Sequence, residues 1–189
     1  MTSEDPDRQS AGIESATDFA RVDDGFERLW TPHRMAYIEG TRPTAEAGDG
    51  CPFCAAPQRT DADGLIVARG ELCYVVMNLF PYNPGHLLIC PYRHVPLYVD
   101  LTESETAEFA ALTKRSLRAL ERAFTPMGYN LGINQGAVAG AGLEEHLHQH
   151  VVPRWRGDSN FLPIVAQTKA LPMLLEDVRT RLAAVWDAD

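Results

Sequence analysis

The stretch "EHLHQHVVP" at positions 145–153 carries three histidines at alternate positions, His146, His148 and His150. Alternate side chains of a β-strand point to the same face, whereas a helix would spread them around its axis. Two β-branched valines follow the triplet and favour the strand. The sequence therefore predicts a strand over 146–153 that presents all three imidazoles on one face.

Other apolar runs with turn residues between them predict further strands. The predicted strands are 65–69, 72–80, 86–92 and 129–135. Only Gly70 and Glu71 separate the first two runs, which indicates a hairpin. The turn "PYNPG" separates the second from the third. This part of the chain is thus typical of an antiparallel meander.

Two helices are predicted from periodicity and capping. Residues 103–124 repeat apolar side chains at helical spacing, and Thr102 with Glu105 fits a capping box at the start. A second helix is predicted over 171–186. Because strands and helices do not alternate regularly, the pattern favours an α+β domain in which helices flank an antiparallel sheet.

The overall charge limits the classes of function. The chain has 189 residues and a formal net charge of −9, which argues against nucleic acid as a partner. It has no apolar run long enough for a membrane span and begins with a polar, acidic stretch unlike a secretory signal. We therefore expect a cytoplasmic protein with a flexible segment over 1–24 and one domain over 25–189.

The residues alone leave three explanations for the histidine triplet. The three could be unrelated, they could bind one metal ion, or one could act as a nucleophile toward phosphorus. The stretch "NQGAVAGAGLEEH" runs directly into the triplet, and its glycines would let backbone N–H groups approach an anion closely. This loop favours the nucleophile.

The sequence resembles the histidine triad (HIT) superfamily of nucleotide hydrolases and transferases. The segment "HLHQHVV" matches its H-x-H-x-H signature, and "MNLFPYNPGHLLICPYRHV" at 77–95 resembles its segment with a Pro-Gly-His turn. The likeness covers roughly 26–186 and looks closest to the diadenosine tetraphosphate phosphorylases of the fragile-histidine-triad branch. It implies a HIT-like fold and a homodimer.

The resemblance implies unequal roles for the three histidines. His148 would attack the α-phosphorus and carry the AMP group, His150 would contact α-phosphate oxygens, and His146 would orient or support the nucleophile. His33 and His86 receive no chemical role, and His86 is interpreted as structural beside the Pro-Gly turn.

The resemblance also implies a nucleotide-binding set. These residues would contact ribose, adenine and phosphates: Asn78, Leu79, Asn134, Gln135, Gly142 and Leu143. Two positions depart from the family pattern. Gln149 stands where an apolar residue is usual, facing away from the active site, and Gly142 stands where many relatives carry Ser, Thr or Gln.

The motif "CPFC" places Cys51 and Cys54 at a spacing typical of a zinc knuckle. A redox-active cysteine pair, or two unrelated cysteines, would show the same spacing. The resemblance supplies the two missing ligands, since some relatives add the histidine of an "RHV" segment and the first histidine of the triplet. Here these are His94 and His146. We therefore expect a structural zinc ion and no organic cofactor.

The sequence thus predicts a phosphorylase that splits diadenosine tetraphosphate into ADP and ATP through a covalent AMP-histidine. Its small-molecule partners would be diadenosine polyphosphates, AMP, ADP, ATP and phosphate. The alternatives are a hydrolase of dinucleoside polyphosphates or nucleoside phosphoramidates, a low-turnover nucleotide-binding zinc module, and a metalloenzyme that uses the triplet on one metal ion.

Overall fold

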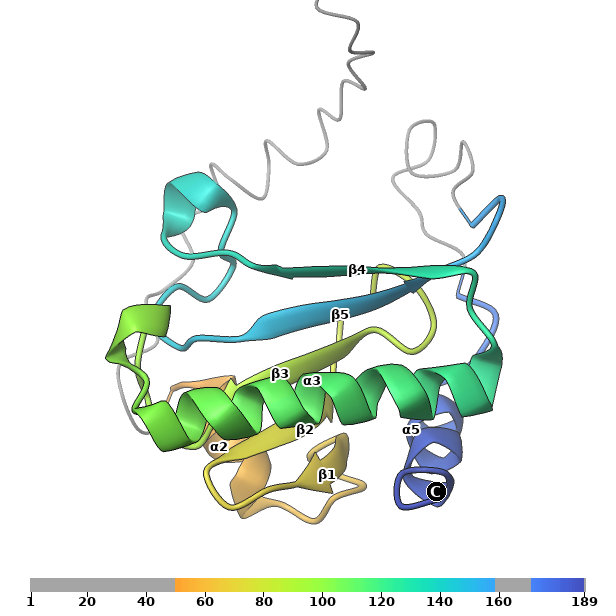
Figure 1. Ribbon diagram of the computed structural model, residues 1–189, viewed down its shortest axis with the longest axis horizontal. Coiled ribbons are helices and arrows are strands. Elements are labelled where there is room, and N and C mark those ends of the chain that lie inside the picture. The colour runs from red at the N-terminus through yellow and green to blue at the C-terminus, as the bar shows by residue number, and fades with distance from the viewer. Residues whose placement is uncertain (1–49, 159–170, 189) are drawn as a thin grey trace, which may run out of the picture. The chain divides into compact units, whose positions relative to one another are not determined.

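The computed structural model describes residues 50–158 and 171–188 (Figure 1). The segment predicted over 1–24 and the domain start at 25 lie outside these ranges. The described chain forms one five-stranded antiparallel sheet with the order β1-β2-β3-β5-β4. Its strands are β1 (Ile66–Arg69), β2 (Cys73–Met77), β3 (Leu87–Pro91), β4 (Gly128–Ile133) and β5 (Gln149–Arg154). The predicted α+β class is confirmed.

The longest helix, α3, spans Glu103–Phe124, as the capping signal predicts. The Thr102 side chain accepts a hydrogen bond from the Glu105 backbone N–H at 3.2 Å, and the Glu105 carboxylate accepts from the Thr102 N–H at 2.7 Å. The other helices of the described residues are α2 (Pro52–Ala55) and α5 (Leu175–Ala184), with 3-10 turns at Ala56–Gln58, Tyr98–Asp100 and Ala137–Ala139. Of the helices described, none has the length and apolar character needed to cross a bilayer.

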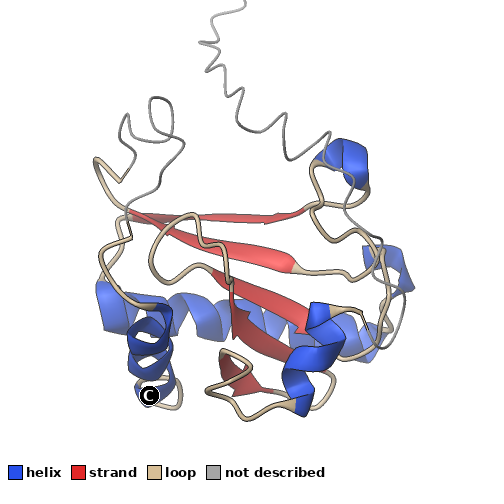
Figure 2. Cartoon of the chain, turned by 180° about the vertical axis from the view of Figure 1, so that it is seen from behind, coloured by secondary structure: helices blue, strands red, loops and turns tan. Residues whose placement is uncertain are grey.

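The two faces of the sheet bury different side chains. Val75 and its cross-strand partner Ile89 belong to a buried cluster that includes α3 residues such as Phe109. Val76 and its partner Leu88 belong to a second cluster, against which Phe53 of α2 packs. Helices α3 and α2 therefore cover opposite faces, which Figure 2 shows from behind. This arrangement explains why β2 and β3 are buried along their whole length.

The predicted hairpin between β1 and β2 is confirmed. Its turn is hydrogen-bonded to a side chain of α3. The Glu108 carboxylate accepts hydrogen bonds from the backbone N–H groups of Glu71, Leu72 and Cys73 at 2.6–2.8 Å. These donors would otherwise lack partners at the turn. The hairpin is thus tied to the helix that covers the sheet.

The predicted strand over 146–153 is wrong at its start, because β5 begins at Gln149. The ladder with β3 ends where Ile89 pairs with Gln149. Before this point the backbone turns to another partner, and the Leu147 N–H donates to the Val95 carbonyl at 2.7 Å. His146 and His148 therefore precede the strand, and only His150 belongs to it.

Candidate active site and metal centre

The four residues proposed as zinc ligands lie together. One ligand atom from each of Cys51, Cys54, His94 and His146 lies within 4.8 Å of the others. The His146 Nδ1 atom is 3.3 Å from the Cys51 sulfur and 3.5 Å from the Cys54 sulfur, and the His94 Nδ1 atom is 3.2 Å from the Cys54 sulfur. A tetrahedral zinc ion with ordinary bond lengths separates a sulfur and a nitrogen ligand by about 3.5 Å. The cluster therefore fits such an ion.

Two backbone features position the ligand atoms of this cluster, one at the start of α2 and one at the Pro91 carbonyl. Cys51 caps the single turn of α2, where Pro52 occupies the first helical position, so the sulfurs at 51 and 54 lie on the same side. His146 is fully buried, and its Nε2–H donates to the Pro91 carbonyl at 2.9 Å. That bond leaves the lone pair on Nδ1, the atom that faces the sulfurs. Burial also lowers the pKa of His146 to about 4, so its imidazole is neutral at pH 7.

His148 is held with its second ring nitrogen available for chemistry. Its Nδ1–H donates to the backbone carbonyl of His146 at 2.8 Å, which places the lone pair on Nε2. Burial lowers the pKa of His148, and this favours the neutral, nucleophilic form. The Phe53 ring lies 4.9 Å from the His148 ring and 5.6 Å from the His146 ring. Phe53 therefore packs against both histidines.

His150 belongs to a chain of hydrogen bonds that fixes its tautomer. The Tyr82 backbone N–H donates to His86 Nδ1 at 3.0 Å, so His86 carries its proton on Nε2. That Nε2–H donates to His150 Nδ1 at 2.9 Å. His150 consequently carries its own proton on Nε2, where it can donate to an anion. Its ring centroid is 5.1 Å from that of His148, and burial lowers its pKa to about 4.

The interpretation of His86 as only structural is therefore incomplete. His86 is fully buried, and it determines which nitrogen of His150 is a donor. The available signal was the alternation after the Pro-Gly turn: Leu88 pairs with His150, and His86 lies two residues earlier on the same face. Nothing in the sequence indicated that Phe53 packs against the histidines, because the residues between the two cysteines of "CPFC" carry no signal of their own.

The geometry does not support one metal ion bound by the whole triplet. His146 uses one ring nitrogen on the Pro91 carbonyl and directs the other toward the cysteines. His148 and His150 use their Nδ1 atoms on a carbonyl and on His86. The three rings thus have separate environments, with His146 in the Cys/His cluster and the other two beside it.

Comparison with known proteins identifies the family. A family model described as the HIT domain matches residues 59–157. An AP-4-A phosphorylase from Mycobacterium tuberculosis is 46% identical over 189 residues, covering 96% of this chain and 97% of that protein. The chain belongs to the HIT family. A bis(5'-nucleosyl)-tetraphosphatase [asymmetrical] from Schizosaccharomyces pombe is 36% identical over 90 residues, covering 48% of this chain and 49% of that one.

Solved structures support the HIT fold independently. A Zn-bound histidine triad family protein from Mycobacterium smegmatis is similar with a TM-score of 0.56 and 27% identity, covering 72% of this chain and 92% of that one. A uridylyltransferase is similar with a TM-score of 0.60, covering 82% of this chain and 49% of that one, but at 22% identity this likeness concerns the fold alone. The predicted HIT resemblance and fold are confirmed.

Two of the predicted nucleotide-binding residues, Asn78 and Leu79, lie in the loop that follows β2. Asn78 joins the histidine network: its Oδ1 accepts from the Phe80 N–H at 2.9 Å, and its Nδ2 lies 3.3 Å from His86 Nδ1. The Leu79 side chain is exposed and free to meet a ligand. Asn78 therefore lies next to the imidazole of His86.

The other predicted nucleotide contacts lie in the Gly-rich connection before β5. The side-chain Oε1 atom of Gln135 accepts from the Tyr98 N–H at 2.7 Å, and Asn134 Nδ2 donates to the Gly140 carbonyl at 3.4 Å. Gly142 and Leu143 follow in the same connection and make no hydrogen bond to the histidines within the described ranges. Gln135 thus supports a neighbouring turn.

Proposed function

We propose that this HIT protein is a diadenosine tetraphosphate phosphorylase. The observation that carries the proposal is the 2.8 Å contact between His148 Nδ1 and the His146 carbonyl, which leaves the lone pair on Nε2. A histidine in this tautomer is suited to attack phosphorus. The 46% identity to an AP-4-A phosphorylase across nearly both chains supports this substrate and this acceptor.

The proposed reaction has two displacements. His148 Nε2 attacks one α-phosphorus, the bond from that phosphorus to its bridging oxygen breaks, and ATP leaves with the electron pair. An oxygen of inorganic phosphate then attacks the phosphorus of AMP-His148, the P–N bond breaks, and ADP leaves. The His150 Nε2–H would donate to a phosphate oxygen as negative charge develops in each step.

Zinc is the second part of the proposal. Cys51, Cys54, His94 and His146 would bind the ion, since their donor atoms and spacings fit a closed tetrahedral site. With four protein ligands, such an ion would have no free coordination position for catalysis. It would instead link three separate segments of the chain. It would fix the segment whose His146 carbonyl and Phe53 ring orient His148.

Further parts of the proposal follow from the family resemblance. Asn78 and Leu79 would contact the nucleoside, whereas Asn134, Gln135, Gly142 and Leu143 would line the phosphate side. A homodimer, a cytoplasmic location and a single HIT domain beginning near residue 25 belong to the same proposal. Light scattering on the purified full chain tests the dimer.

The decisive experiment incubates the full chain with diadenosine tetraphosphate, with and without inorganic phosphate. ADP and ATP in equal amounts, formed only with phosphate, support the phosphorylase. AMP and ATP at a rate independent of phosphate would assign a hydrolase, and no turnover in either condition would refute both. Acid-free trapping of radiolabelled AMP on the protein, lost in His148→Ala, tests the covalent step.

Metal content separates the zinc site from the alternative triplet site. Zinc is measured on purified protein by mass spectrometry, with His148→Ala as the matched control for Cys54→Ser. Zinc retained by His148→Ala and lost by Cys54→Ser supports the four-residue site. Loss on His148→Ala alone would instead indicate a metal bound by the triplet.

A further inference from the structure

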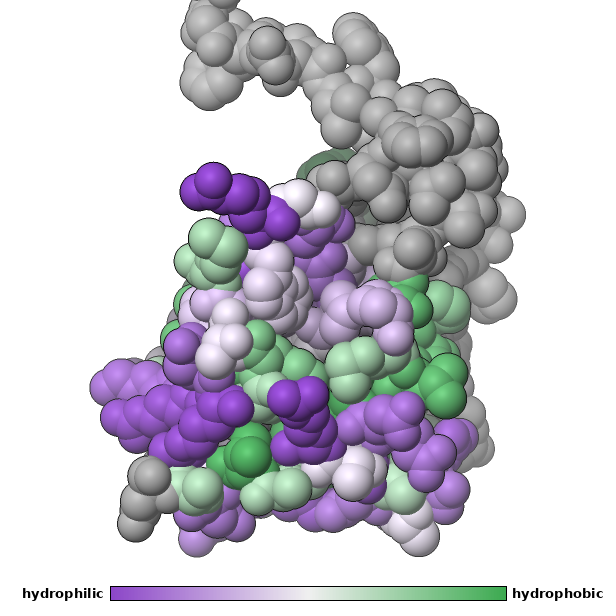
Figure 3. Space-filling model, turned by 90° about the vertical axis from the view of Figure 1, so that its right-hand side faces the viewer, coloured by the Kyte–Doolittle hydropathy of each residue, from purple (hydrophilic) through white to green (hydrophobic). Residues whose placement is uncertain are grey.

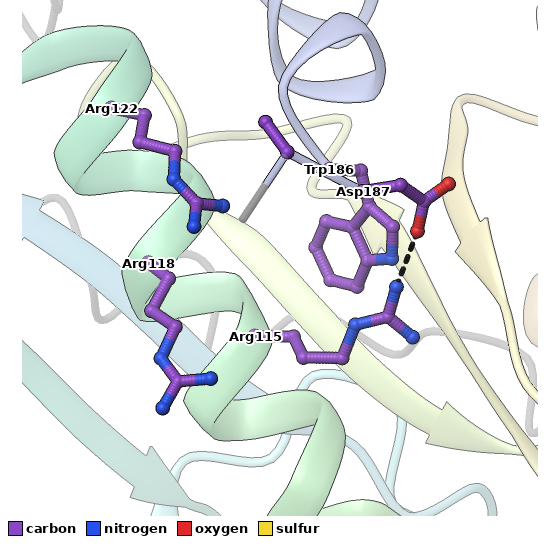
Figure 4. Close-up of a pocket in the computed structure, with 6 residues that line it drawn as sticks. Arg115, Arg118, Arg122, Trp186 and Asp187 are labelled. Atoms are coloured by element: carbon purple, nitrogen blue, oxygen red, sulfur yellow. Dashed lines mark hydrogen bonds and ion pairs between the residues drawn. The ribbon is translucent and has the colours of Figure 1, made fainter.

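A second region of the protein gathers positive charge away from the histidines. Arg115, Arg118 and Arg122 are exposed and follow one side of α3 at positions i, i+3 and i+7. They line a hollow of about 580 Å³ beside the end of α5 (Figure 4). The remaining lining residues are Trp186, Asp187 and Ala188.

The charges in this hollow are not balanced. Among the described lining residues, three guanidinium groups face one carboxylate, that of Asp187, which pairs with Arg115 at 2.6 Å. Arg122 makes one long hydrogen bond, from Nη1 to the Val185 carbonyl at 3.4 Å. Arg118 has no hydrogen bond or ion pair with any residue in the described ranges. The lining thus carries a formal excess of two positive charges in a chain whose net charge is −9.

The wall opposite the arginines is ordered. Trp186 is 7% exposed and belongs to the main buried cluster, and the Arg115 guanidinium carbon lies 5.1 Å from the centre of its ring. This contact and the ion pair with Asp187 hold Arg115 in one orientation. Figure 3 views the face that carries the end of α3, where strongly hydrophilic side chains lie beside apolar ones. Of the three guanidinium groups in the hollow, Arg115 is thus held by a carboxylate, whereas Arg118 and Arg122 pair with no carboxylate among the described residues.

This region lies on the other side of the sheet from the proposed nucleophile. Gln149 faces α3, because its Nε2–H donates to Thr113 Oγ1 at 3.2 Å. His150 follows Gln149 in β5 and pairs with Leu88, which belongs to the opposite face. A ligand bound by the α3 arginines would therefore not contact the histidines.

We propose that the hollow lined by Arg115, Arg118 and Arg122 binds an oligophosphate anion. The outer arginines are seven positions apart, which is about 10 Å along a helix axis. A single phosphate is too short to reach all three guanidinium groups, whereas a chain of linked phosphates can extend along them. Guanidinium groups bind phosphate oxygens through paired, charge-assisted hydrogen bonds. The volume is within the range of small-molecule sites. This proposal does not depend on the reaction at His148.

The test titrates the full chain with sodium tripolyphosphate at constant ionic strength and follows the indole N–H signals by NMR. The chain has three tryptophans, and Trp186→Phe assigns the signal that belongs to the hollow. We expect that signal to shift saturably. The Arg118→Gln/Arg122→Gln variant should weaken binding at least about tenfold, or about 1.4 kcal/mol. Lys114→Gln removes one charge from the same helix outside the hollow and should change binding less than about twofold.

Two further probes define the ligand class. Inorganic phosphate should bind at least about tenfold more weakly than tripolyphosphate, because it reaches fewer arginines. ATP binding as tightly as tripolyphosphate would identify nucleotide tails as a source of the ligand, and tripolyphosphate binding alone would identify an inorganic chain. An unmoved Trp186 signal, equal weakening by Lys114→Gln, or equal binding of phosphate and tripolyphosphate would overturn the proposal.

Discussion

Replacement of His86 tests whether the tautomer of His150 matters for catalysis. His86 accepts from the Tyr82 N–H at Nδ1 and donates to His150 at Nε2, at 3.0 and 2.9 Å. Asparagine carries its polar atoms near the position of Nδ1, whereas glutamine reaches the position of Nε2. His86→Asn therefore preserves the bond from Tyr82 and removes the donor to His150, and His86→Gln does the reverse.

We expect the two variants to separate activity from stability. In His86→Asn, His150 can place its proton on Nδ1, and its Nε2 then presents a lone pair to the phosphate. Loss of one donor to a developing phosphate charge costs about 10²- to 10³-fold in kcat. His86→Gln should retain activity within about tenfold of the wild type. Each variant leaves one buried polar group without a partner, which costs about 1–3 kcal/mol of stability.

The assay measures kcat and KM for diadenosine tetraphosphate at saturating phosphate, together with the free energy of unfolding in urea. The expected pattern is similar stability in the two variants and much lower kcat in His86→Asn. Equal kcat values, or a lower value in His86→Gln, would show that His86 acts through packing and not through the proton on His150.

Three shorter predictions test the metal centre and the frame of the fold. Cys54→Ser should lower the zinc content of purified protein and the melting temperature together; unchanged zinc would contradict the four-residue site. The Arg93 guanidinium holds the pKa of Glu105 at about 2, below its ordinary 4.5, so Glu105 stabilises the fold above pH 4.5 by about 1–2 kcal/mol. That contribution should disappear as the pH falls toward 2, and urea unfolding of Glu105→Gln should show a weaker loss over this range. Gly85→Ala should cost about 1–3 kcal/mol, measured the same way, because Gly85 has φ +81° and an added Cβ would lie 2.9 Å from a Leu120 methyl carbon.

Local signals predicted the elements of this fold better than their ends. The capping box at Thr102 and Glu105 depends on atoms three residues apart, and α3 begins and ends where the sequence indicated. The predicted run over 72–80 ends instead at Met77, since a strand continues only while a neighbour pairs with it. Strand ends depend on distant partners, so apolar composition alone could not place them.

The same distinction applies to the site. The sequence predicted three histidines with one orientation, because a period of two treats His146, His148 and His150 alike. The structure gives His146 contacts with sulfur atoms 92 and 95 residues away and gives His150 a partner 64 residues away. The contact between His86 and His150 follows from the topology of the sheet, which brings β3 beside β5, and the contacts of His146 depend on the position of α2. The family resemblance assigned the three histidines unequal roles, and the spacing alone could not have distinguished them.

The proposed zinc site and the proposed nucleophile are connected through one residue, His146. His146 belongs to the Cys/His cluster through its side chain and to the nucleophile through its backbone carbonyl, which accepts from His148 Nδ1–H. A carbonyl can only accept, so it fixes the tautomer of His148, but it does so only while its own residue is held in place. Burial already holds His146, and a metal ion on its Nδ1 atom would hold it further. Removing the proposed zinc ion should therefore weaken the alignment of His148 without removing any atom proposed to touch the substrate.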